Sequence, residues 1–161
     1  MLGSFGVGKT SLVNQFVHSI FSEEYLTTIG ARIERHELAV DDALLNLIIW
    51  DLAGEDKFDR VRSSYVNGAA GYLLVFAGTR PETVAQGVAV CEESLKLSPG
   101  APVVCVMNKR DLTDRWAVGE AEQRMVAERG WPLLNATATD HASTASVFET
   151  LGRQLRPTPT A

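Results

Sequence analysis

One segment near the start constrains the fold more than any other, and it reads Gly3-Ser4-Phe5-Gly6-Val7-Gly8-Lys9-Thr10. It satisfies the pattern G-x-x-x-x-G-K-[ST] in full. Its glycines permit a tight turn whose backbone N–H groups point inward at an anion, and the helix that follows directs its positive end there. We expect the segment and the adjoining Ser11 to bind nucleotide phosphates, with Lys9 on the β- and γ-phosphates and the Thr10 hydroxyl on Mg²⁺. A glycine-rich turn that merely opens a helix is the alternative.

Beyond this turn, short apolar runs alternate with helical patterns, which is typical of an α/β sheet with crossover helices. Apolar spacing predicts helices over residues 9–20, 82–97, 118–129 and 144–155, and strands over residues 33–40, 43–51, 72–76, 102–107 and 132–134. Residues 21–32 are expected to form a loop, and residues 53–68 an irregular segment with a helical turn. The pattern therefore predicts a mostly parallel sheet flanked by helices.

Length and charge exclude several classes of protein. The 161 residues contain no internal repeat or long linker, so we assign residues 1–156 to one domain and 157–161 to a short frayed tail. The net charge of −5 argues against nucleic acid or an anionic membrane as the main partner. Without a membrane-length apolar run, a leader or a lipid-attachment signal, we expect a cytoplasmic protein with no direct lipid anchor. Cys91 and Cys105 lie in apolar stretches and are expected to be buried free thiols.

Two further motifs stand where predicted strands end. Asp51-Leu52-Ala53-Gly54 follows one strand, so the Asp51 carboxylate could hold the metal and the Gly54 N–H could touch a γ-phosphate. Asn108-Lys109-Arg110-Asp111 follows another, and Asp111 could accept hydrogen bonds from N1–H and the exocyclic amine of guanine. Adenine has no such pair of donors. Each motif alone could be an ordinary polar strand end, but together with the first segment they indicate a guanine-nucleotide site.

With these motifs, essentially the whole chain resembles a Ras-superfamily small GTPase of the Rab-like branch, which implies the P-loop NTPase fold. Residues 25–30 resemble the first switch, and the resemblance implies that Thr28 binds Mg²⁺ and senses the γ-phosphate. Residues 50–58 resemble the second switch. Phe21 stands where the family has an aromatic against guanine, and Thr137-Ala138-Thr139 stands at the base-contacting turn, where Ala138 supplies an N–H.

The resemblance also implies protein partners at the switches: effectors, an exchange factor and a GTPase-activating protein. Rab-like proteins carry a surface aromatic trio for effectors. Trp50 and Tyr65 match two of its positions and Ile33 replaces the third, although packing in the core is an equal alternative for the two aromatics.

Three departures from the family pattern bear on catalysis. Glu55 stands in place of the glutamine that orients the attacking water, and its charge fits poorly beside a γ-phosphate. Phe5 is bulky where the family has a small residue, and Thr139 replaces a lysine beside the base. We therefore expect slow hydrolysis, with Lys9, Glu55, Gly54 and Thr28 as the catalytic set.

The beginning of the chain is unusual for this fold, because only Met1 and Leu2 precede the first glycine. The fold feeds that loop from a central strand of about five apolar residues. We expect this first strand to be largely missing, and we hypothesise that Met1 is not the true start.

The leading interpretation is a GTP/GDP switch that uses Mg²⁺. A non-hydrolysing interaction module, loaded with nucleotide or empty, is the alternative that Glu55, Phe5 and the short start favour. A small-molecule P-loop kinase is a third interpretation, which the guanine-type motif at residues 108–111 opposes.

Overall fold

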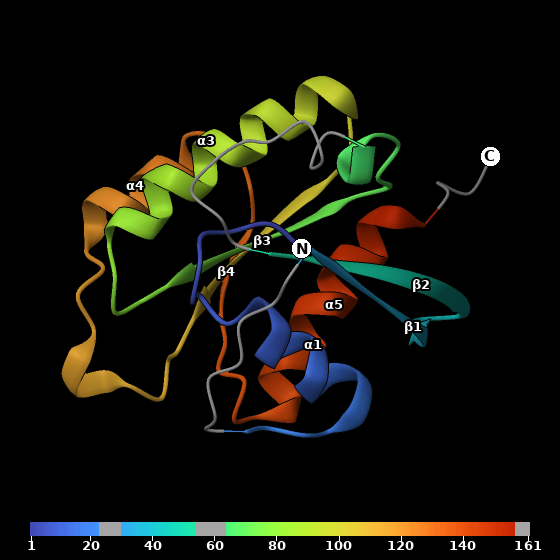
Figure 1. Cartoon of the computed structure of the whole chain (residues 1–161), viewed down its shortest axis with the longest axis horizontal. Coiled ribbons are helices and arrows are strands. Elements are labelled where there is room, and N and C mark those ends of the chain that lie inside the picture. Colours follow the sequence, from blue (N-terminus) through green and yellow to red (C-terminus); the bar gives the residue numbers. More distant parts are fainter. Residues whose placement is uncertain (23–29, 54–63, 157–161) are drawn as a thin grey trace.

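The computed structural model describes residues 1–22, 30–53 and 64–156. Helices and strands alternate from residue 72 onward (Figure 1). Their bounds are α1 Lys9–His18, β1 Ala31–Val40, β2 Ala43–Leu52, β3 Tyr72–Ala77, α3 Glu82–Leu97, β4 Val103–Asn108, the short 3₁₀ helix η1 Thr113–Arg115, α4 Glu120–Ala127, β5 Leu133–Asn135 and α5 His141–Leu155.

The strands form an antiparallel hairpin, β1-β2, and a parallel sheet in the order β3-β4-β5. The first two residues lie between these two parts. The Met1 amino group donates a 2.7 Å hydrogen bond to the Trp50 carbonyl oxygen in β2, and Leu2 forms an isolated parallel bridge with Leu74 in β3. The predicted α/β fold with a mostly parallel, helix-flanked sheet is confirmed, and Leu2 is the residue that stands in the position of the first strand.

Helices cover both faces of the parallel sheet, with α1 and α5 on one side and α3 and α4 on the other (Figure 1). Successive side chains of β3 therefore enter different cores. Leu73 and Val75 pack in the core beside α1 and α5, whereas Leu74 and Phe76 pack in the core beside α3 and α4. All six residues of β3 are buried, which explains why this strand is continuously apolar instead of alternating.

Helix α1 ends two residues earlier than the apolar spacing predicts. Ser19 takes a left-handed conformation with φ 54° and donates its N–H to the Gln15 carbonyl oxygen over 3.1 Å. The next residue, Ile20, is 58% exposed. A hydrophobic side chain that fits the helical period has therefore been left outside the helix by a C-terminal cap.

Helix α5 begins at His141, three residues before the predicted start at Thr144. Asp140 is its N-cap, and the carboxylate accepts a 2.8 Å hydrogen bond from the Ser143 N–H. That hydrogen bond holds the pKa of the Asp140 carboxyl below its usual value. The Asp140 cap therefore begins the helix three residues before Thr144, which is its first buried residue.

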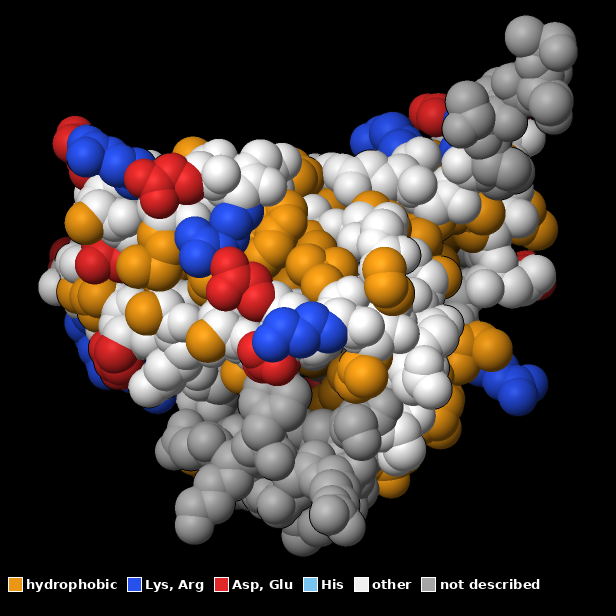
Figure 2. All heavy atoms as spheres, turned by 90° about the horizontal axis from the view of Figure 1, so that it is seen from above, with side chains coloured by type: hydrophobic (Ala, Val, Ile, Leu, Met, Phe, Trp, Pro, Cys, Tyr) orange, Lys and Arg blue, Asp and Glu red, His pale blue; other side chains and the backbone are white. Residues whose placement is uncertain are grey.

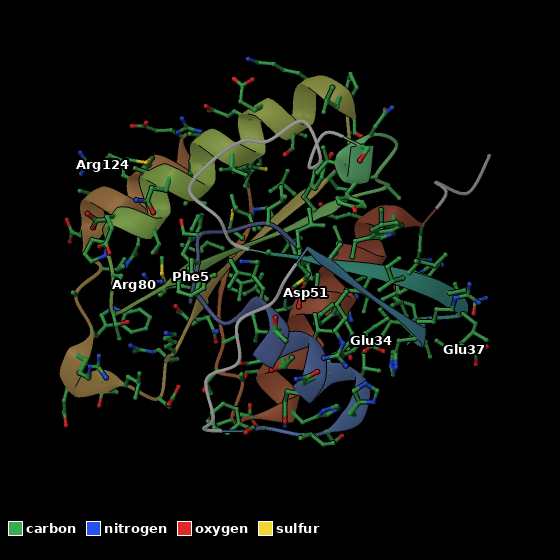
Figure 3. All side chains as sticks on the ribbon, in the orientation of Figure 1. Phe5, Glu34, Glu37, Asp51, Arg80 and Arg124 are labelled. Atoms are coloured by element: carbon green, nitrogen blue, oxygen red, sulfur yellow. The ribbon has the colours of Figure 1, made fainter. Side chains whose placement is uncertain are left out.

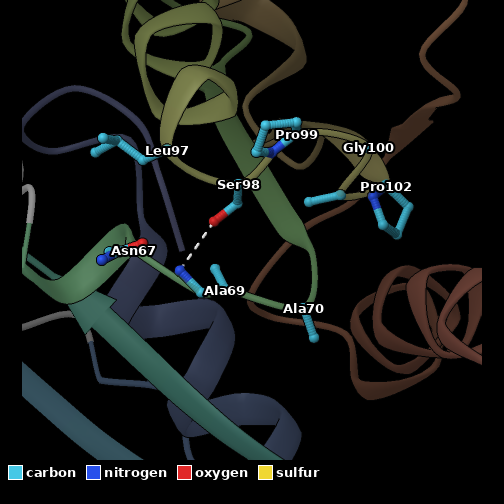
Figure 4. A pocket seen from close by; sticks show the side chains of 10 residues that line it. Asn67, Ala69, Ala70, Leu97, Ser98, Pro99, Gly100 and Pro102 are labelled. Carbon is cyan, nitrogen blue, oxygen red and sulfur yellow. Dashed lines mark hydrogen bonds between the residues drawn. The ribbon is translucent and has the colours of Figure 1, made fainter.

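A shallow cavity of about 370 Å³ lies at the amino ends of β3 and β4 (Figure 4). It is lined by residues 67–70 and 97–102. The Ser98 hydroxyl donates a 3.0 Å bond to the Val66 carbonyl oxygen and accepts a 3.1 Å bond from the Gly68 N–H. Because β3 runs away from this cavity, the cavity and the glycine-rich loop lie at opposite ends of the strand.

Charged side chains of both signs lie close together on the face seen in Figure 2, with apolar side chains between them. Among the helices described, none is long and apolar enough to cross a membrane.

Candidate functional site

The glycine-rich loop, residues 3–8, joins Leu2 to α1 at the carboxyl end of β3. Three of its glycines have positive φ: 140° at Gly3, 71° at Gly6 and 100° at Gly8. A Cβ on Gly3 would lie 2.3 Å from the Val75 carbonyl oxygen, inside van der Waals contact. The loop thus needs glycine for its conformation and for its close approach to β3.

The carbonyl oxygens of the loop accept hydrogen bonds from side chains and from α1. The Lys9 ammonium donates to the carbonyl oxygens of Gly3 at 2.8 Å and Ser4 at 3.1 Å. The Asn108 side-chain amide donates to the Val7 carbonyl oxygen at 2.9 Å. These hydrogen bonds fix the orientation of the loop carbonyl groups, and a backbone nest whose amides point inward is how a loop binds phosphate.

A buried carboxylate lies directly beside the start of α1. The Thr10 hydroxyl donates a 2.5 Å hydrogen bond to Oδ2 of Asp51, and Asp51 is fully buried near the end of β2. Its second oxygen, Oδ1, has no hydrogen-bond partner among the described residues. A buried carboxylate beside a hydroxyl is the oxygen donor set that Mg²⁺ prefers, so these residues fit the metal expected from the sequence.

Residues predicted to contact the base come together from the ends of β4 and β5. These strands are parallel neighbours, with Met107 opposite Asn135. The Thr137 hydroxyl donates a 2.6 Å bond to Asp111 Oδ1 and lies 2.8 Å from the Thr139 hydroxyl. Asp111 and Thr139 are exposed, and Ala138 between the threonines is buried.

Lys109 lies half-buried at the same end of β4, in a left-handed conformation with φ 67°. Burial lowers the pKa of its ammonium, and the positive charges of Arg80 and Arg115 lower it further. The negative charge of Asp111 opposes this effect. Of the two arginines, Arg80 is the one with a hydrogen bond to the glycine-rich loop.

The structure brings Gly3, Ser4, Phe5, Gly6, Val7, Gly8, Lys9, Thr10, Asp51 and Asn108 to one edge of the sheet, with Ser11 half-buried in the first turn of α1. Phe21 follows α1 and is 44% exposed, and Phe5 is 45% exposed. Thr28, Gly54 and Glu55 lie outside the described residues. The Trp50 and Tyr65 rings pack on each other, with centroids 5.4 Å apart, and both remain partly exposed.

The sequence reasoning missed Arg80, which precedes α3. Its guanidinium donates a 2.5 Å hydrogen bond to the Phe5 carbonyl oxygen. In Figure 3 the labelled Phe5 and Arg80 are neighbours. The position of Arg80 in the sequence could have indicated it. Arg80 follows the carboxyl end of β3, and the carboxyl ends of parallel strands share one edge of a sheet.

Comparison with known proteins identifies the family. A model of the Ras family matches residues 1–157. The chain belongs to the Ras family. The Ras-related protein Rab-7b of Mus musculus is 35% identical over an aligned length of 156 residues, and the match covers 94% of this chain and 78% of that protein. The Ras-related protein Rab-25 of Bos taurus is 34% identical over an aligned length of 161 residues, and the match covers 96% of this chain and 74% of that protein.

These matches confirm the resemblance to the Rab-like branch of small GTPases. This Ras-family chain is accordingly a GTP-binding protein of the P-loop NTPase fold, and membership supports a role as a GTP-binding switch.

Proposed function

We propose that this chain binds GDP and GTP together with Mg²⁺ at the edge formed by residues 3–10, 51, 108–111 and 137–139, and that it hydrolyses GTP slowly. The observation that carries the proposal is the buried Asp51 carboxylate, whose Oδ1 has no hydrogen-bond partner among the described residues. A buried carboxylate oxygen without a hydrogen bond is costly, and a cation compensates it.

The loop and α1 bind the phosphates. The amides of residues 3–8 and the positive end of α1 surround the anion, and the Lys9 ammonium moves from the loop carbonyls to the β- and γ-phosphates. Thr10 and Asp51 would hold Mg²⁺, with Thr28 as a further ligand. When bound there, Mg²⁺ would supply positive charge that stabilises the β- and γ-phosphates.

Asp111 selects guanine by accepting hydrogen bonds from N1–H and the exocyclic amine. The Thr137 hydroxyl orients the Asp111 carboxylate through the 2.6 Å bond to Oδ1. Ala138 contributes a backbone N–H and Phe21 packs against the base. Thr139 is shorter than the lysine of the family pattern and covers less of the base, which weakens the grip on the nucleotide.

Hydrolysis transfers the γ-phosphoryl group of GTP to water and yields GDP and phosphate. Glu55 accepts a hydrogen bond from the attacking water, but its charge repels the γ-phosphate, so the step is slow. Gly54 and Thr28 contact the γ-phosphate and release the two switches when it leaves. Effectors, an exchange factor and a GTPase-activating protein bind at these switches.

The second candidate function is a non-hydrolysing interaction module. Glu55 favours it, and so does Phe5, which is 45% exposed on the phosphate loop where bulk opposes the entry of an activating arginine.

Extraction of the nucleotide from the purified, denatured chain tests binding, with identification by ion-exchange chromatography. We expect GDP or GTP in nearly equal amount to protein. Chain that is folded by circular dichroism but carries no nucleotide, and that binds no added GDP, would disprove the proposal.

Single-turnover hydrolysis separates the two candidate functions. We expect slow phosphate release from the loaded chain and a rate about tenfold higher in Glu55→Gln. The matched control is Glu37→Gln, the same change at an exposed position of β1. GTP that stays intact in both the native chain and Glu55→Gln would favour the non-hydrolysing module.

A further inference from the structure

The phosphate loop is held from outside by the start of α3. Arg80 donates a 2.5 Å hydrogen bond to the Phe5 carbonyl oxygen, and the two residues are 75 apart in sequence. The Ser4 hydroxyl donates a 2.8 Å hydrogen bond to Oε1 of Gln86, an exposed residue of α3 that is 82 residues away in sequence. Two consecutive loop residues are thus attached to one helical segment.

The anchor of Arg80 is itself rigid. The Arg80 N–H donates a 2.9 Å hydrogen bond to the Ala77 carbonyl oxygen at the end of β3. The Arg80 carbonyl oxygen accepts a 2.7 Å bond from the hydroxyl of Thr83, and that same hydroxyl accepts a 3.1 Å bond from the Ala77 N–H. Because Thr83 is fully buried, the guanidinium extends from a fixed point.

Arg80 differs from Lys9 in what happens when phosphate arrives. Lys9 occupies the carbonyl oxygens of Gly3 and Ser4, but its ammonium must turn to the phosphates of a bound nucleotide. Arg80 binds the outer side of the loop at Phe5 and does not need to move. A hydrogen bond that can stay in place can keep this peptide oriented when nucleotide binds.

We propose that Arg80 is a positioning residue for nucleotide binding, which ties the Phe5 carbonyl to the segment just before α3 and, with the Ser4–Gln86 hydrogen bond, keeps the loop amides directed at the phosphates. This inference rests on the proposed function. A charge-assisted hydrogen bond of this kind is stronger than a neutral one, and solvent exposure moderates it.

Dissociation of a fluorescent GDP analogue from the full chain with Mg²⁺ tests the role. We expect Arg80→Ala to release the nucleotide about fivefold faster than the native chain and Gln86→Ala about twofold faster. Arg80→Lys should restore part of the slow release, because it keeps a cationic donor at the same anchor. Arg80→Ala within twofold of the native rate would overturn the proposal.

Arg80 also adds positive charge beside Lys109, so the test must separate the hydrogen bond from charge alone. Arg115→Ala is the matched control, since Arg115 is exposed and its charge also acts on Lys109. We expect Arg115→Ala to stay within twofold of the native rate, and the Arg80→Ala effect to persist in 0.3 M salt, where exposed charges are screened. Equal effects of the two variants, or an effect that salt abolishes, would overturn the positioning role.

Two results distinguish this inference from the proposed function. A native chain that does not bind the GDP analogue would reject the function itself, before any variant is compared. A native chain that binds it, with Arg80→Ala unchanged, would reject the inference alone. Far-ultraviolet circular dichroism of each nucleotide-loaded variant verifies that the rates come from folded protein.

Discussion

Gly8 and Asn108 are in contact, although one belongs to the glycine-rich loop and the other begins the motif predicted to recognise the base. A Cβ on Gly8 would lie 2.3 Å from the side-chain nitrogen of Asn108. That nitrogen donates the 2.9 Å hydrogen bond to the Val7 carbonyl oxygen, across 101 residues of sequence. The two motifs are therefore packed against each other, and a substitution in one should shift the residues of the other.

Gly8→Ala should disrupt this unit. The new methyl group would displace the Asn108 amide, break its bond to Val7 and impose φ 100° on alanine. We expect the free energy of unfolding to fall by about 3 kcal/mol in urea titrations. Gly130→Ala is the control, because Gly130 also has positive φ (68°) but nothing within 4 Å of its Cβ. That variant should lose about 1 kcal/mol, and equal losses would contradict the contact.

Asp51→Asn should weaken nucleotide binding without weakening the fold. With Mg²⁺ present, we expect the amide to speed GDP dissociation by about tenfold and to remove most of the difference between Mg²⁺ and EDTA. The nucleotide-free variant should unfold at the same urea concentration or a higher one, since the charge of a buried carboxylate with one oxygen outside any hydrogen bond is gone. Asp114→Asn, at an exposed position of η1, should change neither property. A strongly destabilised Asp51→Asn would argue that the carboxylate serves the fold.

Asp111→Asn should change the preferred base. Its amide can donate to the carbonyl that xanthine carries in place of the guanine amine, whereas guanine loses an acceptor. We expect GDP affinity to fall by at least about 100-fold while xanthosine diphosphate gains affinity, measured by competition with a fluorescent nucleotide. Asp114→Asn is again the control. An unchanged preference for GDP would show that Asp111 does not read the base.

Both cysteines should resist thiol reagents in the folded chain. Each is fully buried, and burial raises the pKa of the Cys91 thiol to about 12 and that of Cys105 further. Because the reactive form is the thiolate, we expect labelling at pH 8 to be about 100-fold slower in the native chain than in denaturant. Above a pH of about 8.5 the thiols of the unfolded chain lose their protons, whereas the folded thiols stay protonated. The free energy of unfolding therefore falls as the pH rises above that value. Rapid labelling of the native chain would contradict this burial.

Local patterns were enough to predict most elements and the family. The apolar runs of β3 and β4 and the helical spacing of α3 could be found without tertiary contacts, because burial on both faces leaves a continuous apolar sequence. The boundaries of α1 and α5 were harder, since Ser19 and Asp140 end or begin helices through caps that the apolar period does not contain.

By itself, the sequence determined which residue types could bind a guanine nucleotide, because the spacing of glycines, lysine and carboxylates reflects backbone chemistry that is local. Only the tertiary structure decided what those residues contact. The Thr10–Asp51 hydrogen bond joins residues 41 apart in sequence, and the Arg80–Phe5 bond joins residues 75 apart. Such contacts depend on which strands lie side by side and where their carboxyl ends meet, and sheet pairing is a non-local property of the folded chain.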